Sequence, residues 1–334
     1  MQQSKPRWVQ RPEGSNWGDF GPDDQLGRMN LITPERRRAA LAEAKEGLCF
    51  SLGLPLDLPG GTALTGGLRQ PPRLFATEMY GNACYNLVAG EDNHDITCDD
   101  GVTLYSQYSS QWDSFAHWGS LFDADGDGTA ELVYYNGFRA GKDVLSPAEG
   151  GPCAKALGME NLASHGAQGR GVMVDLTAHS GPVSYDTLMQ ELDAQGVEVR
   201  TGDFLCLHTG VDEMVLAMGG SPDPEKIGAA AALDGRDKRL LQWIDESGIA
   251  AICADNLAVE PLESYFLPCG HGQSLLPLHE LCLFKLGIHL GELWHMAELK
   301  KWLRANGRSA FLLTAPPWKL PGSVGSPVNP VATV

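Results

Sequence analysis

Short apolar runs alternate with amphipathic stretches over the C-terminal half of the chain. Runs of consecutive apolar residues are typical of buried strands, and apolar positions that recur every three or four residues are typical of helices packed on a sheet. The runs predict strands at Gly171–Leu176, Phe204–His208, Ile249–Ala254 and Ala310–Thr314. The amphipathic stretches predict helices at Tyr185–Gln195, Asp237–Ser247, Leu276–Leu286 and Met296–Asn306. This alternation predicts an α/β fold with a mixed sheet.

The N-terminal part carries one helix signal and then a long irregular stretch. Thr33 is a favourable N-cap, Pro34 suits the first helical position, and Gly47 suits the left-handed position that ends a helix. From residue 48 to about residue 108, turn-forming residues interrupt short apolar pieces, which is typical of irregular β structure and long loops. We therefore expect an N-terminal arm and helix over residues 1–47, followed by one domain over residues 48–334. Pro6 to Pro22 of this arm could pack on a neighbouring copy.

The composition favours a globular protein and excludes two classes of partner. The chain has 334 residues, of which 43% are apolar, enough to fill a sizeable core. Its 42 acidic and 25 basic residues give a net charge of -17, which repels nucleic acid and anionic membranes. Eight cysteines without a CxxC pair indicate reduced thiols. Together with the lack of a long apolar segment, these features lead us to expect a cytoplasmic protein.

The common catalytic signatures are missing from the sequence. There is no GxSxG elbow and no Walker loop, and His279-Glu280 opens like a zinc-protease helix but has Leu283 where the second histidine is needed. The glycines between Gly166 and Gly171 precede a strand, so they do not form a dinucleotide-binding turn.

The stretch from Gln107 to His117 holds the strongest candidate chemistry. If the chain is extended before Asp113, then Gln107, Gln111 and Asp113 project to one face. Their three side-chain oxygens can then converge on one position. Asp113 could also cap a turn that brings His117 back beside it. The simpler interpretation, which the spacing alone favours, is that Asp113 only caps a helix and that the other three are ordinary polar residues.

A family resemblance favours the site. Asp113 and His117 occupy the aspartate and the final histidine of HxGTHxDxPxH, the hallmark of the putative cyclase, or kynurenine formamidase-like, metal-dependent hydrolases. Gln107 and Gln111 replace the first two histidines, so the pattern resembles the QxxxQxDxxxH branch that includes the zinc-dependent trans-dienelactone hydrolases. From about Ser106 to the C-terminus, further matches are His165-Gly166, Gly169–Val172, Asp255–Glu260, His279, Gly291-Glu292 and Pro321–Pro327.

The resemblance implies a swivelling β/β/α cyclase-like single domain, homo-oligomerisation and a metal centre. The implied metal ligands are Gln107, Gln111, Asp113, His279 and Glu292. The implied cation is Zn²⁺ or Mn²⁺, which lowers the pKa of a bound water, and either His117 or Glu292 accepts the proton. The implied substrates are small molecules, namely cyclic esters (lactones), cyclic amides or acyl amides.

A second metal loop and two non-catalytic functions remain open at this point. Asp123, Asp125 and Asp127 copy the start of an EF-hand calcium loop, but the twelfth position is Tyr134 and not Glu. An acidic, solvated insertion explains these residues better. The alternatives to a hydrolase are a calcium-stabilised binding protein and a pseudo-enzyme whose glutamines have abolished metal binding.

Overall fold

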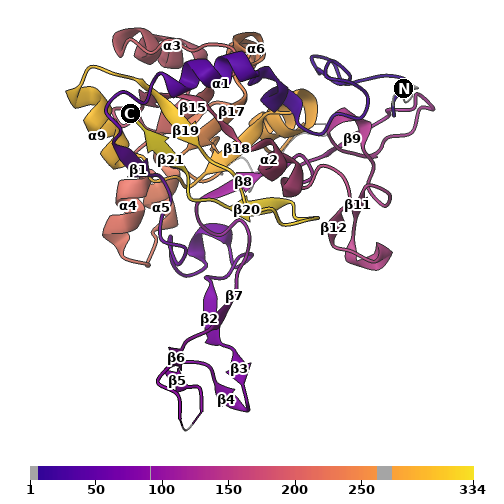
Figure 1. Ribbon diagram of the computed structural model, residues 1–334. Helices are drawn as coiled ribbons and strands as arrows, with labels where there is room; N and C mark the ends of the chain where they lie inside the picture. The colour runs from indigo at the N-terminus through magenta and orange to yellow at the C-terminus, as the bar shows by residue number, and fades with distance from the viewer. Residues whose placement is uncertain (1–6, 91, 262–272) are drawn as a thin grey trace.

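A nine-stranded mixed sheet forms the centre of the molecule (Figure 1). The computed structural model describes residues 7–90, 92–261 and 273–334. Strands β13, β15, β17 and β18 run parallel to one another, and the outer strands pair antiparallel. In spatial order the strands are β1 (Cys49–Ser51), β21 (Val331–Thr333), β19 (Ala310–Thr314), β13 (Gln168–Asp175), β15 (Phe204–His208), β17 (Ala251–Ala254), β18 (His289–Glu292), β8 (Gln111–Asp113) and β20 (Gly325–Pro327). The predicted α/β fold with a mixed sheet is confirmed.

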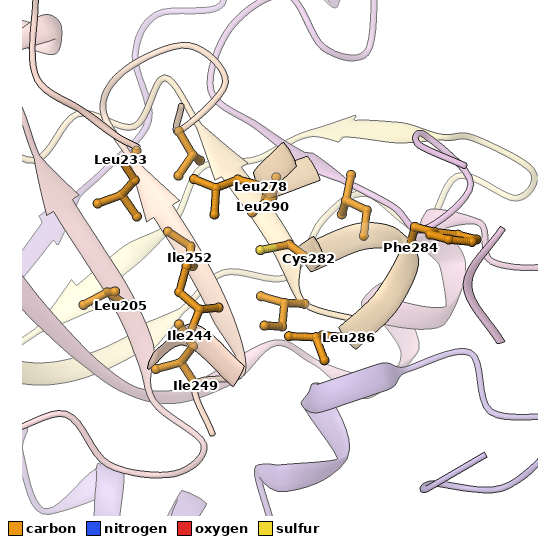
Figure 2. Packing of buried hydrophobic residues seen from close by; sticks show 14 of the residues in the cluster. Leu205, Leu233, Ile244, Ile249, Ile252, Leu278, Cys282, Phe284, Leu286 and Leu290 are labelled. Atoms are coloured by element: carbon orange, nitrogen blue, oxygen red, sulfur yellow. The ribbon is translucent and has the colours of Figure 1, made fainter. Parts of the chain in front are cut away.

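Alternating side chains of the central strands build two hydrophobic cores, one on each face of the sheet. On β15, Leu205 and Leu207 belong to the first core, whereas Phe204 and Cys206 belong to the second. Figure 2 shows the first core, where Leu205 and Ile252 from the sheet face Ile244 from a covering helix. Full burial of each such aliphatic side chain contributes about 1.5–3 kcal/mol to folding.

Helices cover both faces, and most of the predicted ones are present. Those of the first core include α3 (Tyr185–Ala194) and α6 (Lys238–Ser247), and those of the second include α2 (Met159–His165) and α9 (Ala297–Ala305). Helices α2, α4 (Val211–Met218) and α5 (Pro224–Gly228) were not predicted from the sequence. None of the helices in the described residues combines the length and the apolar character needed to cross a lipid bilayer.

The first predicted helix begins where expected but ends early. Helix α1 spans Pro34–Leu41, and the Thr33 hydroxyl accepts a hydrogen bond from the Arg36 amide. The predicted end at Gly47 is wrong, because the Gly47 amide donates to the Val334 carbonyl as the chain enters β1. Gly47 does adopt a positive φ, but it does so in the link to the sheet.

The predicted helix Leu276–Leu286 is a short α-helix followed by a wider turn. Helix α8 (Pro277–His279) continues into a π-helix over Glu280–Leu286. The buried indole of Trp17 donates to the Phe284 carbonyl, and Asn16 donates to the Leu286 carbonyl. Trp17 is 1% exposed, so this side chain packs on its own chain. Pro6 lies outside the described residues, and packing of the arm on a neighbouring copy stays a prediction.

The irregular region predicted around residues 48–108 contains a feature that projects from the body (Figure 1). We call residues 68–105 the projecting ribbon. It consists of β2 (Arg73–Ala76) paired with β7 (Asp100–Thr103), β3 (Glu78–Met79) paired with β4 (Asn82–Ala83), and β5 (Leu87–Val88) paired with β6 (Ile96–Thr97). The remaining two-stranded ladders are β9 (Ser120–Phe122) with β10 (Glu131–Val133), β11 (Val144–Leu145) with β12 (Cys153–Ala154), and β14 (Pro182–Val183) with β16 (Ala232–Leu233).

Candidate metal centre

Two neighbouring strands carry the centre of the candidate site. Strands β8 and β18 pair antiparallel with Gln111 opposite Glu292. Because side chains alternate along β8, Gln111 and Asp113 lie on one face while Trp112 enters the second hydrophobic core. Two side chains fix the backbone of β8 by hydrogen bonds. The indole of Trp294 donates to the Gln111 carbonyl, and the ring of His289 bonds to the Asp113 carbonyl.

Gln107 reaches Asp113 from outside the strand. The predicted extended run from Gln107 to Asp113 is wrong, because Gln107 lies in a turn and β8 begins only at Gln111. Its side chain nevertheless folds back, and its Nε2 donates a hydrogen bond to Asp113 Oδ1. In this arrangement the amide nitrogen of Gln107, rather than the oxygen, faces the aspartate.

The turn after Asp113 returns His117 to it, as predicted. The His117 amide donates to the Ser114 carbonyl, and His117 Nε2 lies 4.0 Å from Asp113 Oδ2. Ser114 Oγ, not Asp113, accepts the Ala116 amide inside this turn. Asp113 Oδ2 has no hydrogen-bond partner. The interpretation of Asp113 as a simple cap therefore does not describe this carboxylate.

His279 enters the site from the last residue of α8 and is oriented by Glu260. Glu260 Oε1 accepts from the His279 amide at 2.9 Å and lies 2.9 Å from His279 Nδ1. A proton on Nδ1 satisfies this contact and leaves Nε2 with a free lone pair. His279 Nε2 lies 3.9 Å from Asp113 Oδ2 and 3.6 Å from Glu292 Oε1. In the sequence, Glu260 stood out only as the end of the matched segment Asp255–Glu260.

The burial of these charges shifts their pKa values. Burial, together with the nearby Glu292, raises the pKa of Asp113 to about 7. Burial opposes protonation of His279, but its hydrogen bond to Glu260 and the nearby Glu292 carboxylate outweigh this and raise the pKa of His279 to about 10 when no cation is bound. Burial likewise opposes ionisation of Glu292, but the nearby His279 keeps its pKa below the ordinary value. Burial and the neighbouring His279 lower the pKa of His117.

The donor atoms that meet here fit a divalent cation. Three oxygens are buried without a hydrogen-bond partner: Gln111 Oε1, Asp113 Oδ2 and Glu292 Oε1. Ligand atoms of Asp113, His117 and His279 lie within 4.8 Å of one another. An unpaired buried oxygen normally costs a protein about 1–3 kcal/mol, so these three oxygens indicate that the site takes up an ion or water. Mixed carboxylate, imidazole and amide-oxygen donors suit Zn²⁺ or Mn²⁺.

The glutamines contribute their amide groups to the carboxylates. Gln111 Nε2 donates to Glu292 Oε2 at 2.7 Å, just as Gln107 donates to Asp113. Each glutamine thus fixes one oxygen of a carboxylate and leaves the other oxygen of that carboxylate without a partner. The structure brings all six predicted site residues together, with Gln107 and Gln111 orienting the acidic groups.

The three tryptophans near the site divide into two roles. Trp112 and Trp294 are fully buried and pack edge to face in the second core, with ring centroids 5.0 Å apart. Trp118 is partly exposed, and its ring lies 5.2 Å from that of His279. Trp118 is therefore the one of these three that can border the site.

The carboxylates of the acidic loop, Asp123–Gly128, accept hydrogen bonds from the backbone of the same loop. Both oxygens of Asp123 accept amide hydrogen bonds from the loop, and Asp127 accepts one from Thr129. Asp125 and Asp127 are exposed to solvent. Carboxylate oxygens of Asp123, Asp125 and Asp127 lie within 4.8 Å of one another, so calcium binding by this loop stays a prediction beside the solvated insertion.

A second buried charge cluster, which the sequence analysis did not assign, lies at the carboxyl ends of β13, β15 and β17. His208 lies 3.6 Å from Asp175, 3.3 Å from Asp212 and 3.8 Å from Asp255, and its side chain is fully buried. Asp255 also accepts hydrogen bonds from the Thr209 amide and hydroxyl. Burial opposes protonation of His208, but the neighbouring carboxylates of Asp175 and Asp212 raise its pKa to about 9.

The sequence and the fold of this chain are similar to those of known proteins. The family model described as putative cyclase matches residues 38–261. No curated protein matches the sequence. The crystal structure of a novel cyclase is 30% identical, with a TM-score of 0.74, and the match covers 96% of this chain and 97% of that one.

Two isatin hydrolases share the fold at lower identity. Isatin hydrolase A from Ralstonia solanacearum is 15% identical with a TM-score of 0.55, and the match covers 90% of this chain and 97% of that one. Isatin hydrolase A from Labrenzia aggregata, bound to benzyl benzoate, is 12% identical with a TM-score of 0.57 and coverage of 89% and 98%.

Proposed function

Because this chain belongs to the putative cyclase family, we propose that it is a metal-dependent hydrolase that opens a small cyclic ester or amide. One observation carries this proposal: three buried, unpartnered oxygens and two imidazole nitrogens converge where β8, β18 and α8 meet. Asp113, His279 and Glu292 would hold the cation, with Gln111 Oε1 beside them. When bound, the cation would lower the pKa of a water molecule and polarise the substrate carbonyl.

His117 is the best placed proton acceptor. His117 Nε2 lies 4.0 Å from Asp113 Oδ2, so a neutral ring can accept a proton from a water that attacks beside Asp113. The ring is 22% exposed, whereas Glu292 is 4% exposed, so His117 is also the group that can pass the proton on to a leaving oxygen or nitrogen. Glu260 holds the proton on His279 Nδ1 and so keeps Nε2 directed to the cation.

Within the hydrolases, we place this chain in the branch that includes the trans-dienelactone hydrolases. Support comes from the glutamines at positions 107 and 111, which stand where other family members carry histidine. Because their amide nitrogens hold Asp113 and Glu292, the site keeps carboxylate ligands well oriented with fewer imidazoles. A lactone is the substrate class that follows from this branch.

Metal content and hydrolysis should rise and fall together. Protein purified without chelator should carry one tightly held Zn or Mn per chain, measured by elemental analysis. A panel of lactones, cyclic imides and N-acyl anilines, assayed with and without added Zn²⁺ or Mn²⁺, should show turnover of at least one class. Chelator should abolish this turnover, and the same cation should restore it. Calcium alone would instead favour a binding protein, and the lack of any bound metal would favour a pseudo-enzyme.

Removal of the His117 ring should separate proton transfer from metal binding. We expect His117→Ala to lower kcat by about 10²–10⁴-fold, the usual loss for a general base, while most of the metal is retained. His94→Ala, at an exposed histidine of the projecting ribbon, is the matched control and should change neither value. If His117→Ala lost the metal together with the activity, His117 would be a ligand and not the base.

A further inference from the structure

A small cavity lies beside the carboxyl half of β13, where the pairing with β19 has ended. The register of these two strands runs only as far as Val172 of β13. Beyond it, the side chain of Gln195 takes the place of a strand, because its Oε1 accepts from the Asp175 amide and its Nε2 donates to the Asp175 carbonyl. The cavity next to this segment, between the C-terminal ends of α3 and α9, has a volume of about 250 Å³.

The charged side chains around this cavity are mostly positive. Lys300, Arg304 and Arg308 line it with three cations, whereas Asp175 is the one acidic residue among the described residues that line it. Three positive charges less one negative charge leave a net charge of +2 here, in a chain whose overall net charge is -17. A local excess of cations attracts an anion even where the molecule as a whole is acidic.

Two of these cations share a single carboxylate oxygen. Lys300 Nζ lies 3.6 Å and Arg304 Nη1 lies 3.3 Å from Asp175 Oδ2. The other oxygen, Asp175 Oδ1, accepts from the amide and the hydroxyl of Thr177. Neither cation donates a hydrogen bond from its side chain to a described residue. The N–H groups of the lysine and of the arginine therefore remain available to the oxygens of a ligand.

Arg308 borders the cavity with one nitrogen that has no acceptor. Its Nη2 donates to the carbonyls of Glu43 and Ala310 and lies 3.5 Å from the Glu43 carboxylate. Its Nη1 is buried and has no hydrogen-bond partner. Because a buried donor of a charged group is costly without a partner, this nitrogen indicates an acceptor that the chain itself does not supply.

We propose that this cavity binds a phosphate dianion, either free inorganic phosphate or the phosphate group of a small monoester. Arginine and lysine are the usual phosphate ligands, and a guanidinium can pair with two phosphate oxygens at once. A phosphate group carries a charge of about -1.5 to -2 at neutral pH, which matches the +2 of the lining side chains. The cavity is smaller than the roughly 300–1,000 Å³ of a drug-sized ligand site, so the organic part of a monoester is small or reaches into solvent. The proposal does not depend on the proposed hydrolase activity.

Calorimetric titration with inorganic phosphate, at neutral pH and constant ionic strength, tests the proposal. Wild type should bind about one phosphate per chain. The double variant Lys300→Gln, Arg304→Gln removes two of the three cations and should raise the dissociation constant about tenfold or more. The control Lys238→Gln, Lys301→Gln makes the same change in net charge at two exposed lysines that do not line the cavity, and it should bind phosphate like wild type.

A single exposed substitution supplies a second test if the double variant does not fold. The Arg304 side chain is 68% exposed, so Arg304→Glu should leave the fold intact while it places a negative charge beside the cavity. This variant should also raise the dissociation constant for phosphate about tenfold or more. Phosphate should increase the melting temperature of wild type more than that of either variant, because a ligand that binds only the folded state stabilises it.

Titration with glycerol phosphate separates the two sources of the phosphate group. Tighter binding of glycerol phosphate than of inorganic phosphate supports a monoester as the ligand, and the reverse order supports the free ion. A wild type that takes up neither compound at millimolar concentration would overturn the proposal. Equal affinity of wild type, the double variant and Arg304→Glu would do the same, because the three cations would then act only on Asp175 and on the carbonyls at the helix ends.

Discussion

Asp113→Asn should leave the chain folded but without its metal, and hydrolysis should fall by about 10³-fold or more. The substitution keeps the shape of the side chain and removes one anionic ligand from a site where Asp113 Oδ2 has no other partner. Elemental analysis and turnover with the best substrate of the panel measure the two effects. Asp127→Asn, the same change on the exposed acidic loop, is the matched control and should leave both unchanged.

The stability of the metal-free variant distinguishes a functional aspartate from a structural one. Burial and Glu292 raise the pKa of Asp113 to about 7, so the ionised carboxylate is unfavourable in the folded protein at neutral pH. Neutral asparagine removes this cost, and we expect metal-free Asp113→Asn to melt at or above the temperature of metal-free wild type. A large decrease in melting temperature, with metal and turnover retained, would assign Asp113 to the framework of the fold.

His208→Gln should destabilise the protein by about 3 kcal/mol near pH 6, with a loss that shrinks as the pH approaches 9.5. The pKa of His208 is about 9 in the fold, against about 6.5 in the unfolded chain. The protonated ring therefore stabilises the fold fully below pH 6.5, and this contribution disappears as the pH rises through 9. Its physical origin is one cation among the carboxylates of Asp175, Asp212 and Asp255.

Urea unfolding of wild type and His208→Gln at pH 6 and pH 9.5 measures this difference. His94→Gln, at an exposed position, should match wild type at both pH values. Equal losses for His208→Gln at the two pH values would show that the ring acts through its packing and not through its charge.

The parts of the fold set by local patterns were predictable from the sequence. Strands β15 and β19 match their predicted bounds because consecutive apolar residues leave few other structures open, and Thr33 was identified as a cap because capping depends on neighbours in sequence. The π-helix after His279 was not predictable, since its free carbonyls are taken by Asn16 and Trp17 from the far end of the chain.

The candidate site shows the same division between local and distant information. The four-residue spacing predicted that His117 lies beside Asp113, and the family resemblance added His279 and Glu292 to the site. Neither revealed that Gln107 folds back from a turn, or that Glu260 orients His279, because both depend on side-chain hydrogen bonds formed only in the finished fold. In the sequence, Glu260 follows a predicted loop. Nothing there distinguishes a carboxylate that only holds the loop from one that hydrogen-bonds to a metal-binding histidine.

The pairing of Gln111 with Glu292 joins residues 181 positions apart in the chain. During synthesis the first half of the cluster emerges long before the second, so a growing chain holds Gln111 and Asp113 without the groups that complete the cradle. Uptake of the proposed cation would then follow the placement of β18 beside β8. If the proposed cation binds here, metal content would report that β18 and β8 have paired.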